Sequence, residues 1–255
     1  LGIGGGFLIA GLLGPVLGWR WTFVAMGGIG LVALAVLVRL RDDPPDLSHR
    51  PTLLGNLSAL AAAFRIAPRG FWASLAIIAA HAHTGTSPFV QLWLVGEKGY
   101  DPETAAAVYG GMFLIVGLAG TFGTGLLGDW AYNRLGWDRA RTALVTLLVI
   151  GPLLPLYRLA PGGSLPFLLG MVGSILYMTV LYGPIFAVIE ELLPARLKAT
   201  STGLNMLLIN IFALGAVSLA IGVASDALAA AGSLRSWTWP LLGADVLALL
   251  AIPFT

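Results

Sequence analysis

The stretch LNMLLINIFALGAVSLAIGVA, residues 204–224, decides the fold, because it contains no Asp, Glu, Lys or Arg. A helix that crosses a membrane needs about 20 mostly apolar residues to span about 30 Å of hydrocarbon. This stretch meets that requirement and predicts a transmembrane helix. Seven further apolar stretches surround it along the chain: 2–17, 21–38, 71–95, 105–127, 143–160, 165–189 and 237–253.

The composition of the whole chain agrees with this interpretation. Of its 255 residues, 58% are apolar and only 10% are charged, and the mean hydropathy is +0.89. A soluble globular domain carries about 25% charged residues. This composition excludes a soluble enzyme, a nucleic-acid-binding protein and a disordered linker.

The fold class that these stretches predict is an all-α, multi-pass integral membrane protein. The stretches are too long, and too rich in Gly and Ala, for the alternating pattern of a transmembrane β-barrel. Helices are the remaining structure that satisfies all backbone polar groups within lipid. The net charge of +2 gives no basic cluster for nucleic acid, and the absence of Cys together with only three His argues against a metal site.

Basic residues divide unequally between the two sets of loops. Four of them lie at the end of an odd-numbered stretch or in the loop after it: Arg20, Lys98, Arg158 and Arg235. The ten that follow even-numbered stretches are Arg39, Arg41, Arg50, Arg65, Arg69, Arg134, Arg139, Arg141, Arg196 and Lys198. Because short cytoplasmic loops are enriched in Lys and Arg, the second set is predicted to face the cytoplasm.

One long cytoplasmic loop divides the chain into three regions. The domains predicted are the last two helices of a truncated N-terminal half (1–40), this central loop (41–70) and a six-helix bundle (71–255). Within the loop, Leu53, Leu57, Leu60 and Phe64 recur at helical spacing. They predict a helix that lies at the bilayer interface or, equally well, a linker helix packed on the bundle. Because transporters are often built of two six-helix halves, we expect this chain to hold helices five to twelve of twelve.

Gating is predicted at three places in the sequence, and the third is Pro88 in the stretch 71–95. Pro15, near the end of the first stretch, is expected to kink or end its helix. Glycines four residues apart (Gly2 and Gly6) in the same stretch indicate either tight helix packing or a helix that flexes during transport. Asp129 follows an apolar stretch and precedes Arg134 and Arg139. A carboxylate at a helix end could bind a neighbouring helix and release it as two halves rock; the alternative is a set of boundary charges.

Polar residues inside the membrane are the strongest pointers to a substrate site. At 100° per residue, His81, Thr84, Pro88 and Gln91 fall on one stripe of stretch 71–95, whereas His83 points about 200° away from His81. We therefore favour His81 for binding an anionic group or a proton, over a His satisfied by a helix carbonyl. Pro88 is expected to kink the helix and to act in gating.

The other candidates for substrate binding lie on later stretches. They are Tyr109, Phe113, Tyr177, Asn205 and Asn210. The tyrosines and Phe113 could line a cavity or pack in the core, and the asparagines could contact substrate or join helices. No mechanism is built on Asp245, which lies within the last apolar stretch.

Several motifs resemble the major facilitator superfamily. The segment GWRWTF (18–23) resembles the start of its sixth helix, and residues 125–141 resemble its cytoplasmic G-x-x-x-D-R-x-G-R-R loop, with Trp130 where the pattern has Arg. The resemblance implies a twelve-helix fold. Further motifs look like the Spinster-type branch, which implies a lipid or organic-solute transporter: Arg41–Pro45, Tyr182–Pro184, Leu193–Pro194, 196–205, Asn210 and 222–226.

The function predicted is a secondary active transporter that moves a small amphipathic or organic solute, lipid-like or an organic anion, by alternating access. The alternative is a non-transporting membrane receptor or scaffold on the same fold. An enzyme is not expected, because H-E-x-x-H, G-x-x-x-x-G-K-[ST] and G-x-S-x-G are all absent. No cofactor is predicted, and proton or cation coupling stays open. The expected partners are the substrate and membrane lipids, in a bacterial inner membrane, and the full-length protein is expected to be a monomer.

Overall fold

A computed structural model describes residues 2–39, 52–66, 68–182 and 193–254, and this described part is helical with no strand. Residues 41–45, 183 and 184 of the resemblance motifs, and the boundary between the first two predicted domains, lie outside it. The α-helices are α1 (Gly2–Leu37), α2 (Leu53–Ile66), α3 (Pro68–Ala80), α4 (Val90–Glu97), α5 (Pro102–Leu135), α6 (Arg139–Ile150), α7 (Leu153–Leu159), α8 (Leu165–Tyr182), α10 (Ala195–Ile209), α11 (Ser218–Ala230) and α12 (Thr238–Ala251). The other elements are the 3₁₀ helices η1 (His81–Phe89) and η3 (Ile252–Phe254) and the π-helix η2 (Asn210–Val217).

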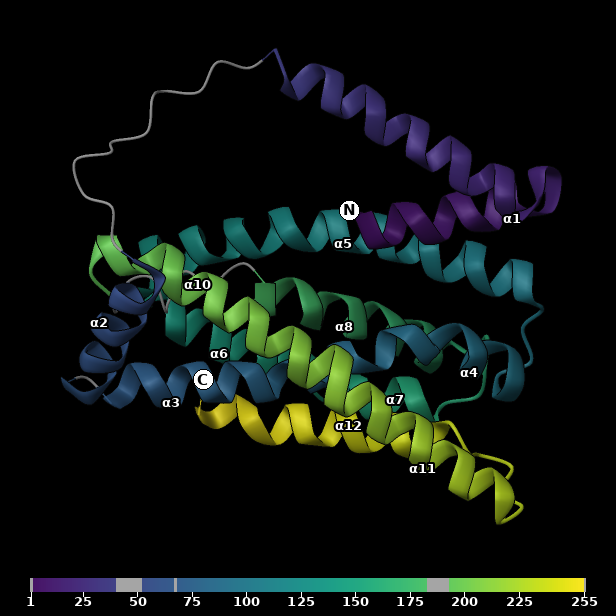
Figure 1. Ribbon diagram of the computed structural model, residues 1–255. Helices are drawn as coiled ribbons and strands as arrows, with labels where there is room; N and C mark the ends of the chain where they lie inside the picture. Colours follow the sequence, from purple (N-terminus) through teal and green to yellow (C-terminus); the bar gives the residue numbers. More distant parts are fainter. Residues whose placement is uncertain (1, 40–51, 67, 183–192, 255) are drawn as a thin grey trace.

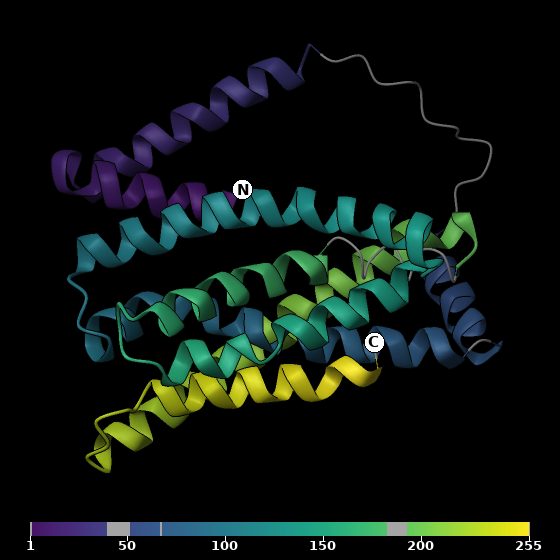
Figure 2. The same cartoon turned by 180° about the vertical axis from the view of Figure 1, so that it is seen from behind.

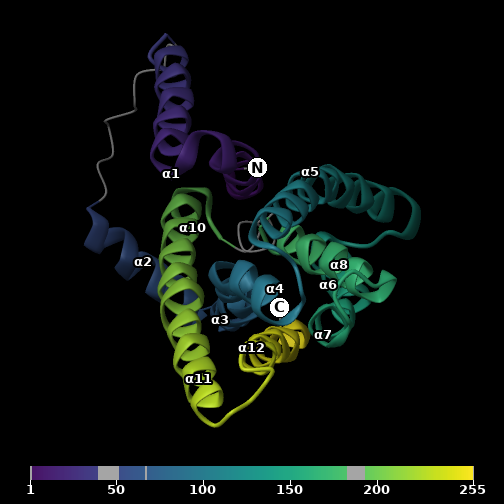
Figure 3. The same ribbon diagram turned by 90° about the vertical axis from the view of Figure 1, so that its right-hand side faces the viewer.

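The column formed by α3, η1 and α4 lies in the middle of a helix bundle. Viewed end-on, α10, α11, α12 and α8 surround this column (Figure 3). The first part of α1 runs beside α5, and its second part turns away from the bundle (Figures 1 and 2). Within this column, residues 76–78 and 80–86 are buried, and this is where buried polar groups gather.

Over the residues that the structure describes, all eight predicted stretches coincide with helical elements; residues 183–189 of the stretch 165–189 lie outside the described residues. Within the described part of the chain, five helices are long and apolar enough to cross a membrane: Val16–Leu37, Pro102–Leu135, Arg139–Leu159, Leu165–Tyr182 and Leu197–Ala230. The stretch 71–95 is not among them because η1 interrupts it. Pro88 lies within η1, and a proline removes the backbone N–H that an α-helix needs for its i→i−4 bond. A kink or break near Pro88 is thus confirmed, but it takes the form of nine residues of tighter helix.

The break in α1 falls at Gly18, which corrects the prediction for Pro15. The helix continues through position 15, and only Gly18 has a non-helical backbone conformation, with φ 72° and ψ 161°. A positive φ costs glycine little, because it has no Cβ to clash with the backbone. The turn between stretches 2–17 and 21–38 is therefore made by this single glycine.

The helix α5 extends well beyond the predicted stretch 105–127. The Asp101 carboxylate caps its first turn by accepting a hydrogen bond from the Thr104 N–H at 2.9 Å. Gly136 ends it in the left-handed conformation, with φ 65°. Asp129 and Arg134 therefore lie within the helix and are exposed, which corrects the prediction that Asp129 stands at a helix end.

The helix α2 lies in the region predicted as the central loop, and it packs on the bundle. Leu60 is 2% exposed, and the Asn56 side-chain amide donates to the Thr200 hydroxyl of α10 at 3.1 Å. Phe64 packs edge-to-face on Phe71 of α3, with ring centroids 6.0 Å apart. These contacts are those that a packed linker helix requires.

Close packing between α7 and α8 depends on glycines. A Cβ added at Gly170 would lie 2.5 Å from the backbone N and Cα of Tyr157, and one at Gly173 would overlap the side chain of Leu153. Such contacts let two helix backbones approach closely inside a membrane. They hold α7, which carries a key residue of the site, tightly against α8.

We expect Gly170→Ala to lower the free energy of unfolding by about 1–3 kcal/mol, because the added methyl group forces α7 away from α8. Thermal unfolding of the purified protein in detergent measures this change. The matched control is Gly125→Ala on α5, where nothing lies within 4 Å of the added Cβ. Equal melting temperatures of the two variants would show that the close approach contributes no stability.

Candidate functional site

A buried ion pair lies at the centre of the bundle. The Arg158 guanidinium, from α7, donates through Nε to Oδ2 of Asp245, from α12, at 2.7 Å. Both side chains are 0% exposed. Charged groups are rare inside membrane proteins and are kept there by pairing, so this pair is the strongest site candidate by its chemistry.

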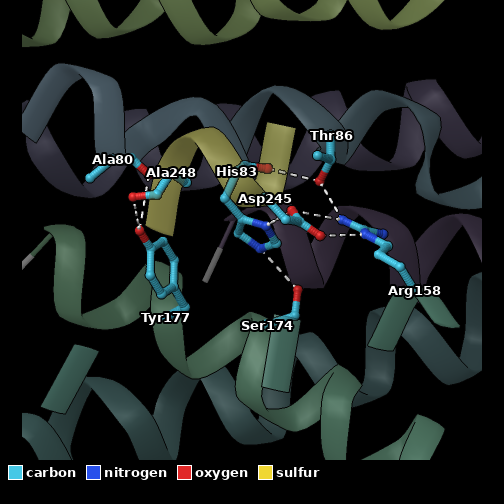
Figure 4. A network of polar contacts seen from close by, with 8 residues as sticks. All are labelled: Ala80, His83, Thr86, Arg158, Ser174, Tyr177, Asp245 and Ala248. Atoms are coloured by element: carbon cyan, nitrogen blue, oxygen red, sulfur yellow. Dashed lines mark hydrogen bonds and ion pairs between the residues drawn. The ribbon is translucent and has the colours of Figure 1, made fainter. Parts of the chain in front are cut away.

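His83 and Ser174 extend the ion pair into a chain of polar contacts (Figure 4). His83, from η1, lies with Nδ1 2.6 Å from Oδ1 of Asp245. Its other ring nitrogen, Nε2, is 2.9 Å from the Ser174 hydroxyl of α8. Because a carboxylate only accepts hydrogen bonds, Nδ1 carries the proton that bonds to Asp245.

Thr86 and two aromatic rings complete the surroundings of Arg158. Nη2 of Arg158 donates to the Thr86 hydroxyl at 2.9 Å, and that hydroxyl donates to the His83 carbonyl at 2.8 Å. The guanidinium also lies 4.9 Å from the ring centroids of Trp93 and Tyr157. Such cation–π contacts stabilise a desolvated cation by about 2 kcal/mol.

A second polar cluster closes one end of the same helices. Lys98 donates to the carbonyls of Arg158 and Ala160 at 2.8 and 2.7 Å, and burial lowers the pKa of its ammonium group. The Glu97 carboxylate accepts from the backbone N–H and the hydroxyl of Thr238 at 3.1 and 2.6 Å. The ends of α4, α7 and α12 are thereby joined next to the buried ion pair.

The chemistry available to the buried network is charge pairing and proton exchange. Within the described residues, no group of three or more His, Cys, Asp or Glu side chains could hold a metal ion. In the network, Asp245 and His83 are the two side chains of these types, and the Asp245 carboxylate is already paired with Arg158. The network thus combines one imidazole with one neutralised carboxylate.

The predicted stripe on stretch 71–95 is only partly assembled. His81 and Thr84 are buried, whereas Pro88 is exposed. His81 contacts the Ile77 carbonyl through Nδ1 at 2.7 Å, and its ring packs edge-to-face on Tyr182. The Gln91 amide donates to the Pro102 carbonyl at 3.0 Å and so joins α4 to the start of α5.

The angle of about 200° expected between His81 and His83 rests on α-helical geometry, which this segment does not have. It assumes 100° per residue, but both residues lie in η1, where a 3₁₀ helix turns about 120° per residue. His81 is 0% and His83 2% exposed. His83, set aside on the helical-wheel argument, is the histidine that contacts the buried charges.

The other predicted substrate residues lie at several separate places. Tyr109 packs edge-to-face on Phe113, with centroids 5.9 Å apart. The Tyr177 hydroxyl donates to the carbonyls of Ala80 and Ala248 at 3.3 Å, which places it beside the network. Asn205 is buried and bonds to Ser201, whereas Asn210, the first residue of η2, is exposed and donates to the Met206 carbonyl of α10.

The predicted gating residues are on the surface where the structure describes their side chains. Asp129, Arg134 and Arg139 are exposed, the first two on α5 and the third at the start of α6. Their gating role stays a prediction.

Sequence reasoning missed Arg158 and Asp245 as site residues. Arg158 was assigned to an outer loop, because it lies near the end of stretch 143–160, yet α7 carries it into the core. Asp245 lies near the middle of stretch 237–253. The usable signal was the presence of one acidic and one basic residue inside apolar stretches, since such residues usually pair.

Comparison with known proteins gives related sequences and folds. The model of the Major Facilitator Superfamily matches residues 1–218. A protein described as a probable sugar efflux transporter, from Helicobacter acinonychis (strain Sheeba), is 27% identical over 152 residues, which cover 60% of this chain and 36% of that protein.

Two solved structures of a bacterial homologue of the human lysosomal transporter Spinster, inward-facing and either unoccupied or occupied, share the fold. Their TM-scores are 0.69 and 0.66 at 22% identity, and each match covers 93% of this chain and 58% or 57% of the other. The chain spans little more than half the length of these structures. The superfamily match confirms the resemblance and identifies a transporter family, not an enzyme family. The chain is an integral, multi-pass membrane protein that belongs to the Major Facilitator Superfamily.

Proposed function

We propose that the full-length protein is a secondary active transporter that moves a small amphipathic solute, lipid-like or an organic anion, by alternating access between two helix bundles. The observation that carries this proposal is the superfamily match over residues 1–218. The structural neighbours, described as a homologue of the transporter Spinster, support the same proposal.

Two segments that contact each other both depart from α-helical geometry, which supports a bundle that changes conformation. The 3₁₀ helix η1 packs on the π-helix η2. The hydroxyl of Ser218, the first residue of α11 directly after η2, donates to the Gly85 carbonyl of η1 at 2.9 Å. A Cβ at Gly85 would collide with the Ala213 carbonyl oxygen. Long 3₁₀ segments and π-bulges within helices often mark hinges and functional sites.

An amphipathic substrate suits the side chains that the described residues offer. The predicted site residues are aromatic or neutral in most cases, and the buried charges Arg158 and Asp245 neutralise each other. An aromatic wall gives an acyl chain or an apolar ring system a large contact area. Tyr109 with Phe113, and His81 with Tyr182, supply such walls on different helices.

A sugar is the second candidate substrate, because the relative from Helicobacter acinonychis is described as a probable sugar efflux transporter. A receptor or scaffold on the same fold is the non-transporting alternative.

We further propose that the protein is located in the cytoplasmic membrane of a bacterium. With Arg158 buried, only Arg20, Lys98 and Arg235 remain on the outer side against ten basic residues on the other.

A transport assay distinguishes these candidates. The full-length protein is reconstituted into proteoliposomes and supplied with either a fluorescent lysophospholipid or a radiolabelled hexose. We expect saturable movement of the lysophospholipid, measured by extraction to albumin, and no saturable movement of the hexose. Saturable hexose flux alone would favour the second candidate. If neither probe moves across the membrane but one of the two still binds to the protein, the result would favour a receptor.

The substitution Phe113→Ala is expected to raise the KM for the lysophospholipid about three- to tenfold, because it removes an aromatic contact worth about 0.5–1.5 kcal/mol. Phe122→Ala is the matched control, since Phe122 lies on the same helix but is 68% exposed. Initial rates over a range of probe concentrations give the KM. Equal values for the two variants would remove Phe113 from the substrate site.

A further inference from the structure

We propose that Glu97 and Lys98 are positioning residues of the transporter, which hold the start of α12 and the end of α7 and thereby set the rate of its conformational change. Glu97 is the last residue of α4, and Lys98 follows it. The effect on the rate rests on the transport function proposed above. The hold on the two helices does not depend on a substrate and can be tested separately.

The Glu97 carboxylate binds the start of α12 through three hydrogen bonds. Oε1 accepts from the Trp237 N–H at 2.6 Å, and Oε2 accepts from the N–H and the hydroxyl of Thr238 at 3.1 and 2.6 Å. The first N–H groups of a helix have no partner within that helix, and the helix dipole favours a negative charge beside them. Trp237, the N-cap residue of α12, has no side-chain oxygen to bind them. Glu97 therefore supplies this cap from another helix.

The Lys98 ammonium group binds the opposite end of a different helix. Its Nζ donates to the carbonyls of Arg158 and Ala160 at 2.8 and 2.7 Å. Arg158 lies in the last turn of α7, and Ala160 is the C-cap of that helix. The last carbonyls of a helix lack partners within it, and a positive charge beside them is favourable. Two adjacent residues of opposite charge thus bind helix ends of opposite polarity.

Trp93 connects these contacts to the buried ion pair. The centroid of its ring lies 4.9 Å from Lys98 Nζ and also 4.9 Å from Arg158 Cζ. Its indole N–H donates to the Thr238 hydroxyl at 2.9 Å, and that same hydroxyl donates to Glu97. Trp93 is 0% exposed, so its ring is packed on all sides. The end of α4 is therefore linked to both helices that carry the ion pair.

These contacts fix α4 at the end that lies away from η1. The 3₁₀ helix η1 continues directly into α4 at Val90, and α4 has eight residues. At 1.5 Å per residue, the fixed end lies about 12 Å from η1. A change in the conformation of η1 is therefore passed through a short helix to a point that α7 and α12 share. The strength of this hold sets how readily the three helices move.

Hydrogen–deuterium exchange tests the hold on each helix. The full-length protein is placed in nanodiscs, and peptides that cover 235–241 and 157–164 are followed by mass spectrometry. We expect Glu97→Met to speed exchange of the Trp237 and Thr238 amides at least about tenfold, because hydrogen bonds to a charged group are among the stronger ones. The peptide 157–164 should stay unchanged. Lys98→Met should speed exchange in 157–164, because it releases the end of α7, and leave 235–241 unchanged.

Transport kinetics test the positioning role. With the lysophospholipid probe, Glu97→Met and Lys98→Met should each lower the maximal rate about three- to tenfold and leave the KM unchanged, because neither residue binds the substrate in this proposal. Lys98→Arg should keep the wild-type rate, since a guanidinium group also donates to the two carbonyls. Glu103→Met is the control for both experiments, because Glu103 is an exposed acidic residue in the first turn of α5.

The outcomes separate the two proposals. Exchange of the Trp237 and Thr238 amides that is equal in the wild type and in Glu97→Met would overturn the hold on α12. Equal acceleration of both peptides in each variant would show a general loss of stability and overturn the separate holds. Maximal rates equal to the wild type, or a raised KM at an unchanged maximal rate, would overturn the positioning role. Wild-type protein that moves no probe would contradict the proposed function instead, while exchange would still decide whether the two helices are held.

Discussion

The fold depends on the ion pair between Arg158 and Asp245. Both charges are fully buried, and moving a charged side chain out of water costs several kcal/mol unless it is paired. The pair links α7 to α12, and through Thr86 and His83 both helices are linked to η1 at the centre of the bundle. Helices α7 and α12 are short, so a polar link specifies their positions more strictly than apolar packing alone. The same link places a histidine next to a neutralised carboxylate.

Backbone irregularity and buried polarity occur together in this molecule. The 3₁₀ helix η1 carries His83 and Thr86, and its other side meets the π-helix η2. In lipid, a helix can leave regular geometry only where neighbouring groups satisfy its backbone. The Thr86 and Ser218 hydroxyls do so here, for the carbonyls of His83 and Gly85. The network therefore supports the irregular segment, and that segment presents the network's histidine.

Apolar stretches were enough to predict the helices, their order and the membrane class. They follow from the cost of unpaired backbone groups in lipid, which acts on each stretch separately. The site residues could not be predicted in this way, because their positions depend on local helix geometry and on contacts between different stretches. Whether His81 or His83 faces the charges is set by the switch to 3₁₀ geometry, and whether Arg158 is a loop residue is set by Asp245, 87 positions away. The turn in α1 is made by Gly18 and not by Pro15. The helix continues through position 15, whereas the positive φ of Gly18 interrupts it.

A double-mutant cycle on the buried pair tests this account most directly. Unfolding free energies of the full-length protein in detergent are compared for the wild type, Arg158→Met, Asp245→Asn and the double variant. We predict that Asp245→Asn alone costs about 3–5 kcal/mol, because it leaves a buried guanidinium without a counter-charge. The double variant should then be more stable than Asp245→Asn. Losses that add, as they do for independent sites, would contradict the claim that this pair holds the bundle together.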